Sequence, residues 1–130
     1  MLFLDHNLIF PPVELADKDG VLAIGGDLSV ERLLLAYKSG IFPWYNEGEP
    51  LVWYSPNQRM VLFPKELKVS KSMHQILSKG QFKVTFNQNF IEVISSCMLI
   101  KRKGQDGTWI TNDMLKAYSK LNKLGIAKSV

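Results

Sequence analysis

Several large aromatic side chains lie in or beside turn-rich segments of this 130-residue sequence, and they are its strongest candidates for specific chemistry: Phe42, Trp44, Tyr45, Trp53, Tyr54 and Trp109. An aromatic ring can stack on an unpaired nucleic-acid base, which contributes about 1–3 kcal/mol per base. The same ring can instead cover a small core whose strands are too short to do so alone. Trp53 lies inside an expected strand, which favours the core. Trp44 and Trp109 follow turn-forming residues, and for them both interpretations stay open.

Conventional catalytic sets are not evident in the sequence. Cys97 shares the helical spacing of its apolar neighbours, so a core thiol is favoured over a nucleophile. His74 falls in a basic segment without a Ser or Cys partner nearby, and a solvated histidine is the better interpretation. Gly25-Gly26-Asp27 lacks the Lys-Ser/Thr ending of a phosphate-binding loop and predicts a tight strand-to-helix turn. With one cysteine and two histidines, we expect no metal site.

The charge of the chain is divided unevenly along its length. Up to Pro64 there are four Lys or Arg against eight Asp or Glu, a net charge of −4. From Lys65 onward there are twelve against four, a net charge of +8. The second region therefore has the balance that attracts a polyanion such as nucleic acid, although lysines can also simply solvate helix faces.

The composition is that of an ordinary globular protein, with 46% hydrophobic and 22% charged residues, which excludes disordered and collagen-like classes. The longest apolar runs are about four residues, against the roughly 20 that a membrane-spanning helix needs. The N-terminal MLFLDHN lacks the basic start and the long apolar stretch of a signal peptide. We therefore expect a cytoplasmic location and no membrane partner.

Caps and apolar spacing predict an α+β fold. Four helices are expected, each beginning after a capping residue, and the caps are Ser29, Ser70, Asn87 and Thr111. Tyr37 and Tyr118 fall on the apolar faces of the first and last helix. Short strands are expected over residues 21–24, 51–54, 60–63 and 82–86. Residues 126–130 begin an alternating strand and break off, so we expect the front part of a longer protein.

Five blocks, in the same order along the chain, resemble the leucyl/phenylalanyl-tRNA–protein transferase family. They are GVLAIGGDLS (20–29), ERLLLAYKSGIFPWY (31–45), LVWYSPNQRMVLFP (51–64), VSKSMHQ (69–75) and GTWITNDMLKAYSKLNKLGIAKSV (107–130). One block alone would be a weak signal, whereas five collinear blocks cover almost the whole chain. The departures are small: Val30 replaces the family's usual proline, and Asn57-Gln58 stands where Asp-Pro is common.

This resemblance implies a domain organisation and an activity. It implies a small N-terminal α/β domain at 1–62, followed at 63–130 by the first part of an acyltransferase domain of the acetyltransferase (GNAT) type. The implied activity is transfer of Leu, Phe or Met from aminoacyl-tRNA to the N-terminal Arg or Lys of a protein, which marks that protein for degradation. The partners are then aminoacyl-tRNA and the acceptor protein, with no cofactor and no metal. The alternative is a non-catalytic module that binds tRNA or other RNA.

The resemblance also implies site residues. Trp44 of FPWY and Trp109 of GTWIT match tryptophans that bracket the terminal adenosine and the aminoacyl pocket, which favours the functional interpretation of both. Lys71 and Lys79 match a basic helix implicated in contact with the tRNA backbone. The catalytic residues themselves are expected in the part of the family's chain beyond residue 130.

Two charged residues inside the matched blocks are interpreted structurally. Asp27 lies next to a turn and is expected to cap the first helix. Arg59 also lies beside turn residues and is expected to pair with an acid.

Overall fold

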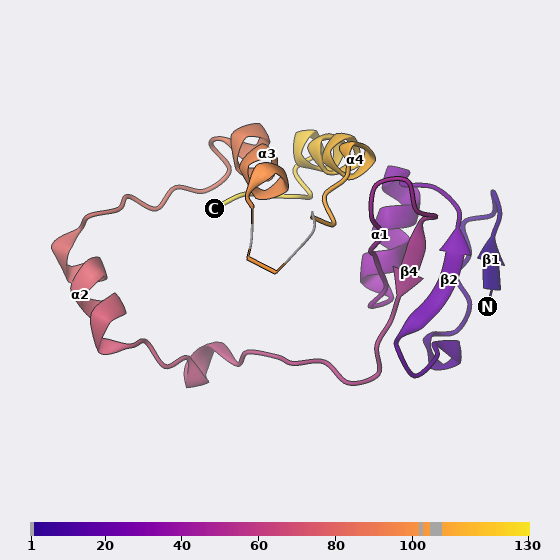
Figure 1. The fold of residues 1–130 in the computed structure, drawn as a ribbon, viewed down its shortest axis with the longest axis horizontal. Coiled ribbons are helices and arrows are strands. Elements are labelled where there is room, and N and C mark those ends of the chain that lie inside the picture. Colours follow the sequence, from indigo (N-terminus) through magenta and orange to yellow (C-terminus); the bar gives the residue numbers. More distant parts are fainter. Residues whose placement is uncertain (1, 102, 105–107) are drawn as a thin grey trace.

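Short apolar strands near the N-terminus form a four-stranded mixed sheet (Figure 1). The computed structural model describes residues 2–101, 103–104 and 108–130. The strands are β1 (Leu2–Leu4), β2 (Val21–Gly25), β3 (Phe42–Pro43) and β4 (Val52–Tyr54), in the spatial order β1-β2-β4-β3. β1 runs parallel to β2, whereas β4 runs antiparallel to β2 and β3. The strands expected at 21–24 and 51–54 are therefore confirmed.

Trp53 is the central side chain of the core. It lies on β4 opposite Ala23 of β2 and is fully buried. Its indole Nε1 donates a hydrogen bond to the Gly25 carbonyl at 2.9 Å, and the edge of Phe10 meets its ring with centroids 4.9 Å apart. The core interpretation of Trp53 is confirmed, because both the ring and its polar atom are used inside the fold.

Helix α1 (Val30–Lys38) covers the sheet. Ser29 caps it, since the Ser29 hydroxyl accepts a hydrogen bond from the Arg32 amide at 3.3 Å. Leu33 and Ala36 are fully buried on the face toward the strands. At the other end the chain turns through Gly40, whose φ of 71° lies in the left-handed region that favours glycine. The helix is therefore set by local signals at both ends.

Helix α4 (Asn112–Lys123) packs against α1 and completes the core. The Thr111 hydroxyl accepts the Met114 amide at 3.2 Å and caps the helix as expected. Met114 and Leu121 are buried, and Leu121 joins the same hydrophobic cluster as Leu33. We call residues 2–55 together with α4 the sheet body.

The remaining α-helices are α2 (Lys71–Lys79) and α3 (Phe90–Leu99). Ser70 caps α2 as expected, and Gly80 ends it in the left-handed conformation. The expected cap of α3 is wrong: Asn89 occupies that position, and Asn87 instead adopts a φ of 52° and donates its amide to the Ser129 carbonyl at 2.7 Å. Cys97 is exposed, because α3 packs along one side only, against α4, so the core-thiol interpretation is also wrong.

Three segments with strand patterns do not form strands. Residues 60–63 and 82–86 have no regular secondary structure and carry exposed apolar side chains. A strand needs a neighbouring strand to bond its backbone, and the part of the chain that the structure describes places none beside them. The segment 126–130 is likewise not a strand.

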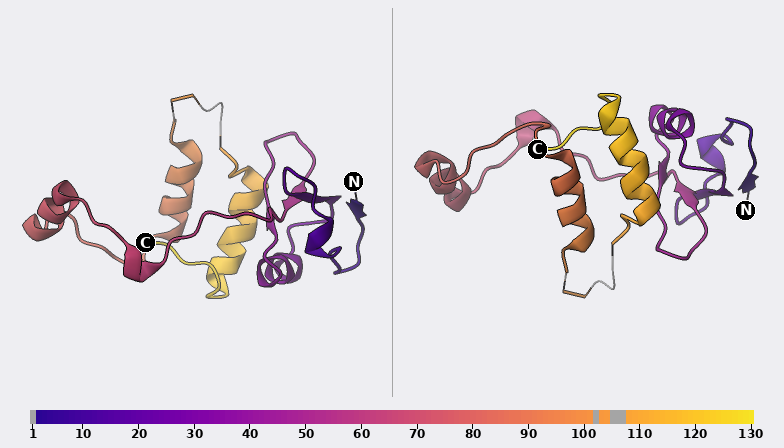
Figure 2. Two further views of the ribbon diagram at one scale, coloured as in Figure 1. Left: turned by 90° about the horizontal axis from the view of Figure 1, so that it is seen from below. Right: turned by 90° about the horizontal axis from the view of Figure 1, so that it is seen from above.

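Residues 60–101, which we call the arm, leave the sheet body as an open loop and return through α3 (Figure 1). The two further views agree that α2 lies at the end of the molecule away from the sheet (Figure 2). The fold class is thus α+β, with a small mixed sheet and four α-helices in the described residues. In those residues no helix is long and apolar enough to cross a bilayer.

Candidate functional site

Three aromatic side chains from distant parts of the sequence meet where α1 lies beside α4. We call Tyr37, Trp109 and Tyr118 the aromatic cluster. The Tyr118 ring meets the Trp109 ring edge-on, with centroids 6.2 Å apart and planes at 77°. It meets the Tyr37 ring in the same way at 6.4 Å and 79°, and the two tyrosine hydroxyls are hydrogen-bonded to each other. Edge-to-face contacts of this kind hold each ring in one orientation.

The two tyrosine hydroxyls stay protonated in this setting. Burial raises the pKa of Tyr37, and the hydrogen bond from Tyr118 only partly opposes that rise. Burial also raises the pKa of Tyr118, strengthened by the hydrogen bond and the charge of Tyr37. Within the pair one hydroxyl donates and the other accepts, so one hydroxyl proton stays free for a ligand. The pair can therefore orient a polar group, but it does not act as a base near neutral pH.

The segment that carries Trp44 is fastened to the start of α4. The Trp44 amide donates to the Val52 carbonyl at 2.9 Å, which extends the pairing of β3 with β4. The next side chain, Tyr45, shares a hydrogen bond with the Thr111 hydroxyl at 3.0 Å. Glu47 accepts the Asn112 amide at 3.3 Å, a favourable place for a carboxylate at a helix N-terminus. The structure thus brings the segments of the two predicted site tryptophans together.

Trp44 and Trp109 differ from the core residue Trp53 in their exposure to solvent. Trp44 is 51% exposed and Trp109 is 38% exposed, whereas Trp53 is fully buried. A half-exposed indole on an anchored segment keeps apolar surface available to a flat ligand. The geometry therefore suits stacking on a base or packing against an apolar side chain.

A cavity of about 560 Å³ adjoins the linked segments, between the turn from β2 to α1, the 45–51 loop and α4. Tyr45 lines it, together with charged side chains of both signs that include Asp27, Asp113 and Lys116. Asp113 and Lys116 form an ion pair at 3.5 Å. Because its charges are mixed, this cavity selects no single class of ligand, and the aromatic cluster is the better candidate site.

Arg32 fixes the turn next to that cavity. Its guanidinium is fully buried, contacts the Asp27 carboxylate at 3.4 Å and donates to the carbonyls of Asp5 and Asn7 at 2.8 and 3.1 Å. Hydrogen bonds from Ser29 contribute most to lowering the pKa of Asp27, and the Arg32 charge lowers this pKa further. Gly26 leaves the needed room, since a Cβ there would lie 3.1 Å from the Arg32 Nε. Asp27 therefore has a structural role, but Ser29 rather than Asp27 caps the helix.

Arg59 also has a structural role, although not the expected one. Its guanidinium donates to the Gly40 carbonyl and to the Pro56 carbonyl at 3.2 Å, and it lies over the Phe42 ring. These partners replace the acid that the sequence suggested. The contacts tie the chain after β4 to the turn that ends α1.

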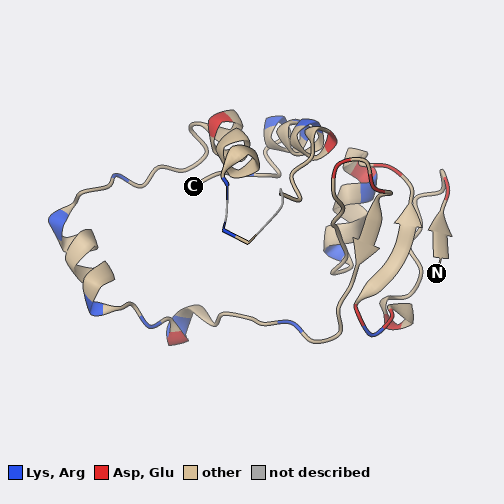
Figure 3. Ribbon diagram, viewed as in Figure 1, with Lys and Arg blue, Asp and Glu red and all other residues tan. Residues whose placement is uncertain are grey.

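Lys71 and Lys79 are not part of the same assembly. They are the first and last residues of α2, and both are exposed. The views in Figures 1 and 2 place α2 away from α1 and α4, so the structure does not bring these lysines beside the two tryptophans. Figure 3 shows the acidic residues mostly around the sheet, and Lys and Arg mostly along the arm and α4. The acidic and basic regions of the sequence therefore also lie in different parts of the molecule.

Sequence reasoning missed three residues of this region. It placed Tyr37 and Tyr118 only on apolar helix faces and did not single out Arg32. The available signal was a polar group on a helix that packs against the rest of the fold, because a hydroxyl or guanidinium that loses contact with water there needs a partner. Which partner it finds depends on how α1 and α4 pack, and helical spacing does not give that.

Comparisons with known proteins give one consistent result. The model of the family described as leucyl/phenylalanyl-tRNA protein transferase matches residues 61–130, and the model of its N-terminal domain matches residues 26–57. A protein named leucyl/phenylalanyl-tRNA–protein transferase from Flavobacterium johnsoniae is 65% identical over 130 residues, which is all of this chain and 61% of the relative. One of the same name from Syntrophobacter fumaroxidans is 55% identical over 127 residues, 98% of this chain and 54% of the relative. This chain thus spans little more than half the length of these relatives.

Proposed function

Because this chain belongs to the leucyl/phenylalanyl-tRNA–protein transferase family, we propose that it takes part in moving Leu, Phe or Met from aminoacyl-tRNA to a protein whose first residue is Arg or Lys. The added residue would mark the acceptor for degradation, in the cytoplasm where charged tRNA is used. The observation that carries this proposal is the family match over both parts of the chain, joined to an anchored aromatic cluster.

The reaction is aminolysis of an ester. The acceptor's α-amine attacks the aminoacyl carbonyl, a C–N bond forms, the ester C–O bond breaks, and the tRNA 3′-oxygen leaves with a proton. The ester is already activated, so the step needs two substrates held in line and an oxyanion stabilised. The attacking amine must be deprotonated, because an ammonium has no lone pair.

The aromatic cluster and Trp44 would hold the end of the tRNA. In this proposal Trp44 and Trp109 bracket the terminal adenosine and the aminoacyl side chain, and their exposed ring surface supports that role. The free hydroxyl proton of the Tyr37–Tyr118 pair would reach a polar group of the same ligand. An apolar pocket separates side chains that differ by a methylene by only about 1–3 kcal/mol, which fits tolerance of both Leu and Phe.

The arm and its lysines would serve the tRNA backbone. Lys71 and Lys79 supply charge at one exposed helix, where phosphate contact adds affinity without reading bases. The arm would also begin the acetyltransferase-like domain near residue 63, and the two family matches, which meet between residues 57 and 61, support this boundary.

The test uses the full-length gene product, Phe-tRNA and a peptide that begins with Arg. Mass spectrometry should detect a peptide longer by one Phe, and the matched peptide that begins with Glu should stay unmodified. Filter binding should also give tighter binding of Phe-tRNA than of Asp-tRNA, because a charged side chain does not suit packing against the exposed indole rings of Trp44 and Trp109. Failure of both transfer and preferential binding would overturn the proposal.

A non-catalytic tRNA-binding module is the second candidate, favoured by the net charge of +8 from Lys65 onward. Such a module would bind charged and uncharged tRNA equally, with a strong dependence on salt, and would transfer nothing. Equal affinity for Phe-tRNA and its deacylated form would therefore favour the module over the enzyme.

A further inference from the structure

The loop that follows Trp44 is closed on itself. The Glu49 amide donates to the Asn46 carbonyl at 3.0 Å, so residues 46–49 form a β-turn. Gly48 supplies the positive φ, 81°, that the third position of this turn needs. The Glu49 carboxylate also accepts the Asn46 amide at 3.2 Å and the Asn46 side-chain nitrogen at 2.9 Å. These hydrogen bonds within the turn hold it in one shape.

Glu47 occupies the second position of this turn and contacts the start of α4. Its carboxylate accepts the Asn112 amide at 3.3 Å. That amide is one of the donors at a helix start that have no partner within the helix, and the positive end of the helix dipole favours a carboxylate there. The Thr111 hydroxyl accepts a different amide, that of Met114. The start of α4 is thus completed by a residue 65 positions earlier in the chain.

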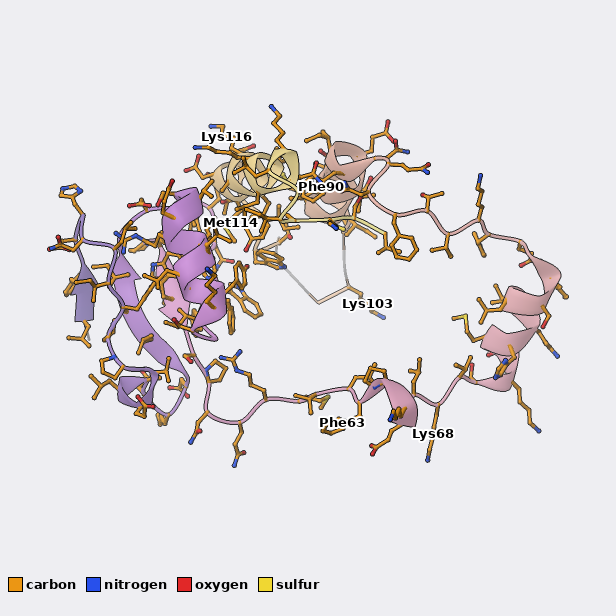
Figure 4. The ribbon with its side chains drawn as sticks, turned by 180° about the vertical axis from the view of Figure 1, so that it is seen from behind. Phe63, Lys68, Phe90, Lys103, Met114 and Lys116 are labelled. Atoms are coloured by element: carbon orange, nitrogen blue, oxygen red, sulfur yellow. The ribbon has the colours of Figure 1, made fainter. Side chains whose placement is uncertain are left out.

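The start of α4 is a fixed base for this contact. Met114, in the first turn of the helix, is fully buried and lies beneath α4 beside α1 (Figure 4). Ile110, just before the helix, is also buried. The Tyr45 hydroxyl meets the Thr111 hydroxyl at 3.0 Å, so the 45–51 loop touches neighbouring residues of α4 at two points. Two contacts fix the direction of a segment as well as its position, whereas a single contact would act as a pivot.

Trp44 lies between two attachments of its backbone. On one side its amide donates to the Val52 carbonyl at 2.9 Å, and on the other side the chain continues into the 45–51 loop. The Trp44 ring is 51% exposed, so the direction of its backbone does more than packing to set where the ring lies. A ring on a released loop would have to be ordered by its ligand, and the cost of that ordering would reduce affinity.

We propose that Glu47 is a positioning residue for aminoacyl-tRNA. Through the Asn112 amide it holds the 45–51 loop, and with it the Trp44 ring, in the place from which the ring binds the end of the tRNA. The inference rests on the proposed function. Glu47 acts through Trp44 and not by contact with the tRNA, because a carboxylate repels phosphate.

The charge of Glu47 lets the direction of the effect test the proposal. Removal of a carboxylate makes the protein more positive, which by itself would strengthen the binding of a polyanion. Loss of positioning would weaken it. Filter binding of Phe-tRNA to the full-length gene product should therefore be about threefold to tenfold weaker in Glu47→Ala, despite the added positive charge. The midpoint of thermal unfolding should change little, because the hydrogen bond is exposed to solvent.

Two further variants separate positioning from charge. Glu47→Gln keeps an oxygen that can accept the Asn112 amide and should restore most of the affinity. Glu31→Ala is the matched control, because Glu31 is an exposed carboxylate in the first turn of α1 and lies outside the 45–51 loop. It should bind Phe-tRNA at least as tightly as the wild-type protein. Binding by Glu47→Ala as tight as that of Glu31→Ala, or binding by Glu47→Gln as weak as that of Glu47→Ala, would overturn the proposal.

A measurement without tRNA distinguishes this proposal from the proposed function. Hydrogen exchange should become faster at Asn112 and over residues 44–49 in Glu47→Ala, and it should stay unchanged in β2. Faster exchange in a protein that neither transfers Phe nor prefers Phe-tRNA would overturn the proposed function and leave the anchoring by Glu47 intact. Unchanged exchange and unchanged Phe-tRNA binding in Glu47→Ala, while the wild-type protein transfers Phe, would overturn the role of Glu47 alone.

Discussion

The hydroxyl pair of Tyr37 and Tyr118 links α1 to α4 through a side-chain hydrogen bond between two partly buried rings. Both pKa values are raised, chiefly by burial. A tyrosine with a raised pKa keeps its proton in the folded state at a pH where the unfolded chain has lost it. Its stabilising effect is therefore complete below about pH 10 and is lost as the pH rises further.

We accordingly expect the free energy of unfolding to fall as the pH rises from 10 to 11. The double variant with Tyr37→Phe and Tyr118→Phe should show a shallower fall, because both shifted groups are gone. Urea denaturation followed by circular dichroism at several pH values measures this. Tyr54→Phe removes a tyrosine outside the pair and serves as the control. An equally steep fall in the double variant would contradict the prediction.

Arg32 offers a second test at the scale of one side chain. Arg32→Met would leave the Asp27 carboxylate and two carbonyls without their donor. Removing one partner of a buried ion pair costs about 3–5 kcal/mol, and we expect the lower end because the Asp27 side chain is 49% exposed. Arg59→Met, which removes an exposed guanidinium, is the matched control and should cost less. Urea denaturation measures the free energy of unfolding of both variants. An equal decrease in the two would contradict the central role of Arg32.

At the scale of elements, Thr111 connects the cap of α4 to the segment that carries Trp44. Its hydroxyl accepts the Met114 amide and also contacts the Tyr45 hydroxyl. Thr111→Ala should cost about 1–2 kcal/mol of stability as a lost helix cap. It should also weaken Phe-tRNA binding, because the Trp44 segment loses its anchor.

Ser70→Ala provides the matched control for this prediction. Ser70 caps α2 in the same way, through the Met73 amide at 3.2 Å, but it does not contact the aromatic cluster. Calorimetry and filter binding on both variants separate the two effects. If Ser70→Ala reduced the preference for Phe-tRNA over its deacylated form as much as Thr111→Ala does, the anchoring role would be wrong.

Elements also divide into those that the sequence could predict and those that it could not. Helices α1, α2 and α4 begin after the expected caps Ser29, Ser70 and Thr111, because a helix bonds its own backbone and its caps are local. The segments 60–63 and 82–86 have strand patterns but lack a neighbouring strand, which no local pattern supplies. Asn87 fails as a cap for a similar reason, since Asn122 and Ser129 hold it in another conformation.

The sequence likewise predicts some features of the candidate site and not others. Trp44 and Trp109 could be singled out because they are large rings beside turns, and the resemblance gave them a role. Their approach depends on Tyr45 meeting Thr111 across a separation of 66 residues, which the sequence pattern does not encode. The distant position of α2 also lay beyond prediction, because no local pattern fixes where an extended segment places a helix.

At the scale of the whole molecule, the charge of the basic arm, unlike that of the acidic sheet body, suits the backbone of a polyanion, and in the proposed function the end of that polyanion would reach the aromatic cluster. Each lysine that contacts a phosphate releases a counterion on binding, so affinity falls with salt in proportion to the number of contacts. Lys71→Ala together with Lys79→Ala should therefore weaken tRNA binding and reduce the slope of log affinity against log salt by about 1–2. The preference for Phe-tRNA over its deacylated form should remain, since the aromatic cluster is untouched.

The matched control for this change replaces Lys18 and Lys38 by alanine, two lysines that belong to the acidic sheet body. Both double variants lose the same net charge, so a general loss of attraction would lower the two slopes equally. If Lys71 and Lys79 of α2 contact phosphate, only the variant that lacks these two lysines has a lower slope. Filter binding from low to high salt gives both slopes, and identical slopes for the two variants would remove Lys71 and Lys79 from the tRNA interface while leaving the aromatic cluster as the proposed site.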